Sequence, residues 1–425
     1  MLEAIKTALK IPDLRKKLIW TLVLLGIFRL GSHIPVPGPW DLSRLKAIFG
    51  GDNNLFGMLD LLAGGALQRM SVFAMSVNPY ITSSIILQLL TMVIPRLEQL
   101  AKEGSEGRKV ISQYTRYGTV ILAVIQGSAM AFGLQGAMTN PTAWDFVLII
   151  TTLTAGSVLV MWLGEILSEH GIGNGISMII FAGIVARIVP GALSVLQSLN
   201  KGNIGVSIFS LLLFLVLAVI IVAGVVFVTQ GERKIPVQYA KRIVGRKMYG
   251  GTSTHLPMRV NQSGVIPVIF ASSLLAFPPT IAQFLQPTHW LYKILNWVSP
   301  GRTLYLILYA LLIFLFTYFY TAVTFNPVEV ANNMKKYGGF IPGIRPGKPT
   351  AEYLDRVLTR ITLVGALFLT FIALLPYLMN LIPGFKGLQV QFGGTALLIA
   401  VGVAIDTMKQ IEAQLLMRQY EGFLK

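Results

Sequence analysis

The stretch Ile204–Val228, IGVSIFSLLLFLVLAVIIVAGVVFV, decides the fold class of this chain. It contains no charged residue, and about 20 apolar residues are enough to cross a lipid bilayer as a helix. The whole chain of 425 residues is 54% hydrophobic and 12% charged, and a soluble domain carries about twice that charged fraction. Lipid offers no hydrogen-bond partner to a free backbone group, so membrane spans fold as helices. We therefore predict an all-α polytopic membrane protein.

Other apolar segments accompany this stretch, and together they predict ten spans with boundaries good to about three residues. The first span is not a cleaved signal peptide, because it contains Arg29 and runs into Pro35 without a small-residue cleavage site. Arg29 would either snorkel to the interface, which we favour, or bond a neighbouring helix. The predicted spans are Leu18–Ile34, Val72–Ile94, Tyr117–Leu134, Phe146–Leu167, Ile176–Val189, Ile204–Val228, Val265–Phe284, Thr303–Thr324, Val357–Met379 and Phe392–Ile411.

The distribution of lysine and arginine predicts the orientation. The N-terminus, the loops at 95–116, 230–259 and 325–360, and the C-terminal end from Lys409 together carry 26 of the 35 lysines and arginines, whereas the opposite side carries 8. Cytoplasmic loops are the ones enriched in these residues. Both termini are therefore predicted to be cytoplasmic, as an even number of spans requires. The amphipathic residues 1–11 lie along the inner membrane surface or form a solvated tail, and the sequence leaves both open.

A short apolar segment, Leu55–Leu67, lies between the first two spans. It contains Asp60 and the pair Gly64-Gly65, and it is too short to cross the bilayer alone. We predict a half-helix that folds back, with a helix on the external surface as the less favoured alternative. Irregular backbone at membrane depth is tolerated only inside protein or beside water. The segment therefore predicts an interior cavity, which it is placed to fill.

The second and seventh spans open in comparable ways. Residues 77–81 read VNPYI, and residues 261–267 read NQSGVIP. Val77 and Ile81 are four residues apart and share a helix face, and Pro79 between them favours a kink. The two openings occupy matching places if the chain consists of two halves of five spans. Because five is odd, the second half would be inverted, and substrate paths usually lie between such halves.

The spans and loops divide the chain into five regions. The predicted regions are a cytoplasmic N-terminus (1–17), an N-terminal half (18–191), an external hinge loop (192–203), a C-terminal half (204–411) and a cytoplasmic C-terminal tail (412–425).

Motifs for nucleotides, metals or catalysis are missing from the sequence. Residues 171–175, GIGNG, have the wrong spacing for a dinucleotide fingerprint, and residues 343–350, GIRPGKPT, have one residue too few between the glycines for a P-loop. The four histidines are scattered and there is no cysteine. Acidic residues within the spans are few, which argues against a proton- or sodium-coupled carrier and against membrane catalysis. A secondary transporter and an insertase without a pore are kept as the alternatives.

Several motifs, spread in order along the chain, carry a family resemblance. They are residues 78–81 (NPYI), 106–109 (EGRK), 113–118 (QYTRYG), 171–177 (GIGNGIS), 253–257 (STHLP) and 340–347 (FIPGIRPG). Together they resemble the bacterial SecY family, the pore subunits of the Sec protein translocon, and the resemblance runs from the first span to the last. It implies ten helices in two inverted five-helix halves around a central pore that conducts unfolded secretory polypeptides. It implies no enzymatic activity and no cofactor.

The resemblance also implies roles for apolar side chains at the pore. The half-helix Leu55–Leu67 matches the plug, with Asp60 inside it, and a ring of aliphatic side chains matches the constriction. Such a ring expels water and blocks ions without using charge, although any one of its members alone would pass for an ordinary core residue. The plug residues are Leu55, Phe56, Met58, Leu59, Asp60, Leu61, Leu62 and Leu67, and the ring residues are Val77, Ile81, Ile180, Ile269 and Ile399. Val77 stands where the family commonly has isoleucine.

A lateral gate toward lipid is implied between the second and seventh spans, with the third alongside. Thr82, Gln126 and Asn261 match its polar cluster. Polar contacts between membrane helices average about 0.6 kcal/mol, which is weak enough for an arriving signal segment to break. Routine interhelical hydrogen bonds are the alternative interpretation of these three residues.

Two cytoplasmic loops match the docking site for the SecA motor ATPase and the ribosome. They are residues 230–259 and Phe325–Tyr353, FNPVEVANNMKKYGGFIPGIRPGKPTAEY. The matching basic residues are Lys241, Arg242, Arg345 and Lys348. Ribosomal RNA is a polyanion that attracts such residues; topology alone accounts for the charge, but not for the ordered prolines and glycines around Arg345. The resemblance further implies the SecE and SecG subunits, signal peptides, nascent polypeptides and membrane lipid as partners, in the bacterial inner membrane.

Overall fold

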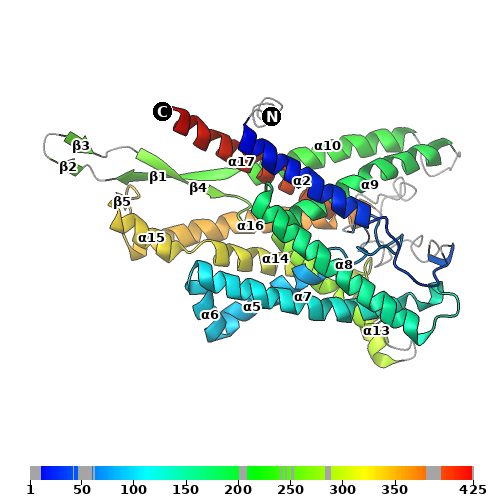
Figure 1. Cartoon of the computed structure of the whole chain (residues 1–425). Coiled ribbons are helices and arrows are strands. Elements are labelled where there is room, and N and C mark those ends of the chain that lie inside the picture. The colour runs from blue at the N-terminus through cyan, green and yellow to red at the C-terminus, as the bar shows by residue number, and fades with distance from the viewer. Residues whose placement is uncertain are drawn as a thin grey trace.

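The computed structural model describes residues 11–41, 43–45, 60, 63–200, 208–239, 242–244, 247–249, 253–282, 289–379 and 394–423. Long helices lie side by side in a bundle, with a small β structure at one end (Figure 1). The helices are α2 (Pro12–Gly31), α5 (Asn78–Val93), α6 (Pro95–Lys102), α7 (Ser105–Gly133), η1 (Gln135–Ala137), α8 (Ala143–His170), α9 (Gly175–Asn200), α10 (Ile208–Gln230), α11 (Ile266–Leu275), α12 (Phe277–Ala282), α13 (Trp290–Trp297), α14 (Thr303–Thr324), α15 (Pro327–Lys336), α16 (Lys348–Met379) and α17 (Gly394–Phe423). The strands are β1 (Glu232–Tyr239), β2 (Arg242–Val244), β3 (Lys247–Tyr249), β4 (Ser253–Arg259) and β5 (Gly339–Phe340).

The helical fold is confirmed, and each predicted span contains at least one of these helices. Among the described residues, three helical segments are long and apolar enough to cross a membrane, namely α8, the segment Thr303–Lys336 that consists of α14 and α15, and α16. The pair α5 and α6 passes only together, and the two are bent by 101°. The total of ten spans therefore stays a prediction.

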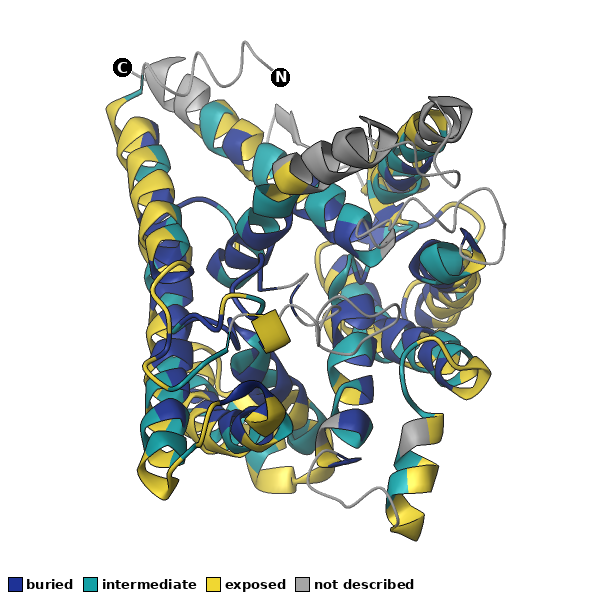
Figure 2. Ribbon diagram, turned by 90° about the vertical axis from the view of Figure 1, so that its right-hand side faces the viewer, coloured by how far each residue is buried: buried dark blue, intermediate teal, exposed yellow. Residues whose placement is uncertain are grey.

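The outer surface of the bundle is apolar. Leu22, Phe227 and Ile307 are large hydrophobic side chains that point away from the protein. Exposed positions lie on the outer faces of the helices, whereas buried positions lie where helices face one another (Figure 2). A soluble protein rarely exposes apolar surface on this scale, so the surface fits a bundle surrounded by lipid.

The second span begins later than predicted. Residues 72–77 form turns, and α5 begins only at Asn78 with Pro79 in its first turn. Proline suits that place because the first amides of a helix have no partner within the helix. The predicted kink at Pro79 is therefore wrong, and the proline starts the helix instead.

The predicted half-helix also differs at its end. Residues 63–70 are a series of turns, and Gly64 and Gly65 have φ values of 66° and 85°. These left-handed conformations suit glycine and stop a helix. Only Asp60 and residues 63–67 of the predicted half-helix lie among the described residues.

Helices continue through three other boundaries between the predicted regions. α9 extends to Asn200 with Pro190 inside it, so most of the predicted hinge loop 192–203 is helical. α17 continues to Phe423 through most of the predicted C-terminal tail. α2 begins at Pro12, inside the region predicted as an N-terminal extension. These stretches keep enough helix-forming residues to prolong the helices.

The N-terminus of α8 allows a stability prediction. The Thr142 side chain accepts a hydrogen bond from the Asp145 amide, and the Asp145 carboxylate accepts one from the Thr142 amide. Loss of such a cap costs about 1 kcal/mol. Thr142→Ala should therefore lower the thermal midpoint of the detergent-solubilised protein, whereas Thr359→Ala, which removes only a bond within one helix, should leave it nearly unchanged. Equal midpoints for the two variants would contradict this role of the cap.

Candidate functional site

The segment that joins Asp60 to α5 is packed directly against the backbones of neighbouring helices. A Cβ atom added to Gly156 in α8 would lie 2.0 Å from the carbonyl oxygen of Val72. One added to Gly64 would lie 2.7 Å from Cα of Gly183 in α9. Because glycine alone permits such approaches, this segment lies in a close-fitting site formed by α8 and α9.

The five predicted ring residues all lie in the interior. Val77, Ile81, Ile180, Ile269 and Ile399 are each less than 8% exposed, and all belong to one hydrophobic cluster. They come from four places in the chain: the start of α5, and helices α9, α11 and α17. α5 packs against α11, and α9 packs against α17. The structure therefore gathers the five into one apolar core region, which contains many other residues as well.

The similar openings of the second and seventh spans recur as similar local structure. Val77 and Val265 each precede a helix whose first turn contains a proline, and α5 and α11 are in contact. Thr82 on α5 and Asn261, which precedes α11, are buried, and Gln126 on α7 is half-buried. The Asn261 side chain accepts a hydrogen bond from Ser263. Within the described part of the chain, no hydrogen bond joins the three predicted gate side chains to one another.

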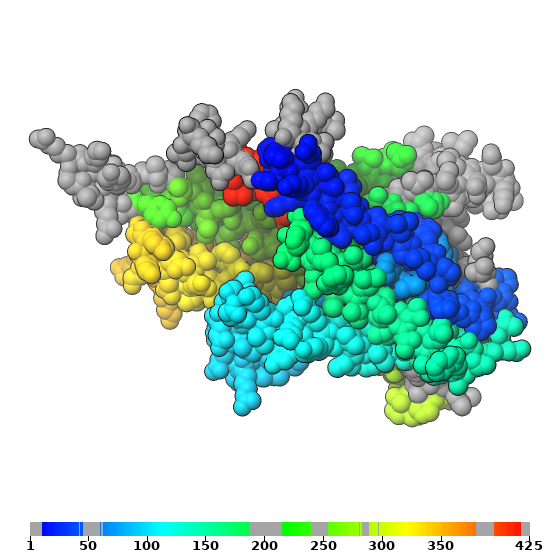
Figure 3. Space-filling view, in the orientation of Figure 1, coloured from blue at the N-terminus to red at the C-terminus, as the bar shows by residue number. Residues whose placement is uncertain are grey.

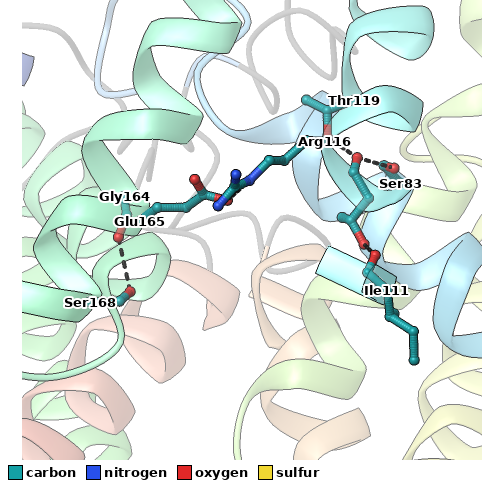
Figure 4. Close-up of polar contacts among 8 residues, drawn as sticks. Ser83, Ile111, Arg116, Thr119, Gly164, Glu165 and Ser168 are labelled. Atoms are coloured by element: carbon teal, nitrogen blue, oxygen red, sulfur yellow. Dashed lines mark hydrogen bonds and ion pairs between the residues drawn. The ribbon is translucent and has the colours of Figure 1, made fainter. Parts of the chain in front are cut away.

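Polar contacts link α5 and α8 to α7, which lies between them (Figure 4). The Ser83 hydroxyl of α5 donates to the carbonyl oxygen of Thr115 at 2.8 Å, and Arg116 donates to the Glu165 carboxylate of α8 at 2.8 Å. Arg116 belongs to the QYTRYG motif, so that motif holds neighbouring helices together. The ion pair is partly solvated, and such pairs add at most about 1 kcal/mol.

The GIGNG motif makes the tight connection between α8 and α9. Gly173 has a φ of 86°, and a Cβ atom on Gly175 would lie 2.0 Å from the carbonyl oxygen of Gly164. The Ser168 hydroxyl accepts a hydrogen bond from the Gly175 amide at 2.8 Å. These glycines therefore serve close packing of two helices.

The two regions predicted as cytoplasmic loops pair with each other and form a single structured unit, which the sequence did not predict. Strand β1 pairs antiparallel with β4 on one side and with β5 on the other, as in the pairing of Gln238 with Phe340. Beneath the sheet, Ile235, Met258 and Ile341 pack with Leu354 of α16. We call this unit, residues 232–259 with 325–354, the terminal platform. It projects from one end of the bundle, where Figure 3 shows α15 in yellow.

The terminal platform presents Arg345 on its surface. Ile341 is buried, and the Thr350 hydroxyl donates to the carbonyl oxygen of Arg345 at 2.8 Å. Gly343 and Gly347 have φ values of 81° and 100°, so the turn depends on glycine at both places. Arg345 and Lys348 are exposed. The loop is thus held from both sides while its basic side chains face water.

Some predicted site residues lie outside the described residues. They are the plug residues Leu55, Phe56, Met58, Leu59, Leu61 and Leu62, and Lys241 of the docking site. Arg242 lies in β2. The remaining plug residues, Asp60 and Leu67, are both buried.

Two arginines contact the region of Asp60; sequence reasoning missed Arg187 and left a bond from Arg29 as the less favoured alternative. Arg187 of α9 pairs with the Asp60 carboxylate, and Arg29 of α2 donates to the carbonyl oxygen of Gly64. For Arg29, the structure shows the bond to a neighbouring segment rather than the favoured snorkelling. A signal was present in the sequence, because Asp60 and Arg187 are opposite charges in otherwise apolar segments. Such groups within the membrane usually pair.

Comparison with known proteins agrees with this architecture. The family model described as SecY matches residues 71–408. The SecY subunit of the protein translocase from Streptomyces coelicolor is 48% identical over 445 residues, and that from Halalkalibacterium halodurans is 48% identical over 438 residues. In both cases the match covers 100% of each chain.

Solved structures show the same fold. A structure of a protein-conducting channel matches with a TM-score of 0.68 at 22% identity, covering 96% of each chain. Sec61 in the canine ribosome–channel complex matches with a TM-score of 0.64 at 20% identity, again covering 96% of each chain. Sequence and fold thus lead to one conclusion, that the chain belongs to the SecY family.

Proposed function

We propose that this chain forms a passage for unfolded polypeptides, closed at its middle by the aliphatic ring Val77, Ile81, Ile180, Ile269 and Ile399. It is a protein-translocation channel of the bacterial membrane, crosses that membrane several times and is not a catalyst. The main support for this ring is that all five side chains are buried in one apolar cluster, although they come from four separate parts of the chain. An apolar constriction can exclude ions when empty and deform around any sequence when occupied.

The contact between α5 and α11 supports a second part of the proposal, the sideways release of signal and transmembrane segments into lipid. Both helices have a proline in their first turn, close in sequence to the proposed ring residues, and Thr82 of α5 and Asn261 before α11 are buried polar residues. Separation of the two helices would connect the passage to the bilayer. The few weak polar contacts there would resist this only slightly.

The terminal platform supports a proposal about partners. Its exposed Arg345 and Lys348 stand on a fixed turn, which suits a polyanion or an acidic protein surface. We assign to it the ribosome and the SecA motor ATPase, with SecE and SecG as companion subunits in the membrane. The platform and both termini then face the cytoplasm, in agreement with the excess of basic residues.

Crosslinking to a stalled secretory chain tests the passage. The protein contains no cysteine, so Ile81→Cys and Ile269→Cys each introduce one reactive thiol. A stalled chain carrying one cysteine, treated with a short bifunctional thiol reagent, should crosslink to both positions. Phe371→Cys is the matched control, because Phe371 is 57% exposed on the outer surface of α16.

The position of the crosslinks decides the outcome. Crosslinks at residues 81 and 269, with little at 371, support a path through the middle of the bundle. Crosslinks mainly at 371, or equal at all three positions, would mean that the polypeptide travels along the outside of the protein, as an insertase without a pore would carry it.

A further inference from the structure

An ion pair between two distant parts of the chain is buried beside the plug turn, by which we mean Asp60 and residues 63–70. Arg187 Nη1 lies 2.6 Å from Asp60 Oδ2. The Asp60 side chain is 2% exposed and the Arg187 side chain 14% exposed. Because little water screens charges at such depth, the attraction between the two groups is stronger than at a surface.

Asp60 also organises the plug turn itself. Its Oδ1 atom accepts a hydrogen bond from the Gln68 amide at 3.0 Å, and its backbone carbonyl accepts one from the Gly65 amide at 3.1 Å. One carboxylate oxygen is therefore bound to the turn, while the other is bound to α9. Through this single side chain the fold of the turn is coupled to its attachment.

Two more contacts hold the same turn. Arg29 Nη1 of α2 donates to the carbonyl oxygen of Gly64 at 3.0 Å, and the Gly64 backbone lies against the backbone of Gly183. Arg187 follows Gly183 by four residues and thus lies on the same face of α9. The backbone contact and the ion pair therefore attach the turn to one face of α9, while Arg29 holds it from α2.

We propose that Arg187 and Arg29 are positioning residues that keep the plug turn in the closed passage, and that the Asp60–Arg187 ion pair is the contact that releases it. This inference rests on the proposed function and adds to it the plug that the family resemblance implies for residues 55–67. A buried ion pair adds little net stability compared with apolar packing, yet removal of one partner is strongly destabilising. Water that enters with a polypeptide solvates both charges and weakens their attraction. The ion pair therefore holds the plug turn while water is excluded from the site, and it breaks when water enters.

Halide leak through proteoliposomes that contain the full chain with its membrane partners tests the proposal. Arg187→Gln leaves the buried Asp60 carboxylate without this cation, so the resting leak should rise about tenfold or more. Asp60→Asn should leak less than Arg187→Gln, because the amide oxygen can still accept from Gln68 and the charge left behind, Arg187, is the more exposed of the two at 14% against 2%. The double variant Asp60→Asn/Arg187→Gln should also leak less than Arg187→Gln, because no buried charge remains.

Two controls separate the possible failures. Deletion of residues 55–67 should leak strongly. Without leak from this deletion the segment does not seal the pore and the inference about the plug turn falls, whereas the passage itself is decided by the crosslinks at residues 81 and 269. If the deletion leaks but Arg187→Gln does not, or if Asp60→Asn fails to reduce the Arg187→Gln leak, only the proposed role of the Asp60–Arg187 ion pair is wrong. The exposed pair Asp41–Arg44 is the matched control, because hydrogen bonds from Ser43 lower the pKa of Asp41 and keep it charged. Asp41→Asn should not change the leak.

A thiol at the plug turn gives a readout that does not depend on pore conductance. Leu67 is fully buried, so Leu67→Cys should react slowly with a membrane-impermeant maleimide in the otherwise unchanged chain. Adding Arg187→Gln should speed the reaction about tenfold, and adding Asp60→Asn to both should slow it again. If the labelling rate is the same in all three backgrounds, with equal amounts of protein in the membrane, the Asp60–Arg187 ion pair does not hold the plug turn.

Discussion

Replacing Arg345 by glutamate is expected to reduce motor-driven export of a secretory protein at least about tenfold, which corresponds to 1.4 kcal/mol. Arg345 is exposed at the top of a turn that its own backbone, Thr350 and Ile341 hold in place. Exchanges of exposed side chains usually change stability by less than about 0.5 kcal/mol, so the fold should remain. A like charge facing the partner, in contrast, costs several kcal/mol of binding. ATP-dependent uptake of a purified precursor into proteoliposomes measures the effect.

Arg302→Glu is the matched control for this charge reversal. Arg302 is also exposed but precedes α14 at the other end of that helix from the terminal platform, where an acidic residue suits the helix dipole. Export by the Arg302→Glu variant should stay near normal. Export by Arg345→Lys should lie between that of Arg345→Glu and that of Arg302→Glu, since lysine keeps the charge but loses the planar donor group. Equal export by Arg345→Glu and Arg302→Glu would remove Arg345 from the docking site.

The interiors of the spans could be predicted from sequence because composition alone decides them. Ile204–Val228 has no charge, and no other structure than a helix satisfies its backbone in lipid. The ends of the helices are harder to predict, because single residues decide them. Pro79 starts α5 where a kink was expected, and the left-handed Gly64 and Gly65 stop any helix before them.

The terminal platform could be predicted only in part. The charges and the turn glycines around Arg345 are visible in the sequence, and Ile235 and Val237 alternate with exposed residues in β1 as a half-buried strand requires. The partner strand β5 is only two residues long and about 100 residues away, as the pairing of Gln238 with Phe340 shows. A strand that short has no periodicity of its own, so the union of the two regions follows from packing alone.

The same limit applies to the plug turn. Asp60 and Arg187 are 127 residues apart, and Arg187 lies near the end of the predicted span Ile176–Val189, where the sequence does not indicate its partner. Its pairing depends on the close approach of Gly64 to Gly183, which only the folded backbone shows. Charged residues in apolar segments indicate that each has a partner, but they do not identify it.

Gly156→Ala and Gly26→Ala are expected to change stability in opposite directions, although both are glycine-to-alanine exchanges within a helix. Alanine favours a helix over glycine by up to about 1 kcal/mol, and nothing lies within 4 Å of a Cβ atom on Gly26. Gly26→Ala should therefore raise the thermal midpoint. At Gly156 the new Cβ would lie 2.0 Å from the Val72 carbonyl oxygen, a backbone atom that cannot rotate away.

The loss at Gly156 should exceed the gain in helix propensity, because overpacking costs about 1–3 kcal/mol or more. Relief of the clash requires movement of residues 72–77, which lead from the plug turn to Val77 at the start of α5. Gly156→Val should therefore fail to accumulate in the membrane. The Gly156→Ala protein that does accumulate should leak ions, because Val77 would leave the ring. Immunoblotting of membranes and thermal melting in detergent measure the first effect, and halide leak the second. A Gly156→Ala protein as stable and as tight as the parent would show that α8 does not fix the position of Val77.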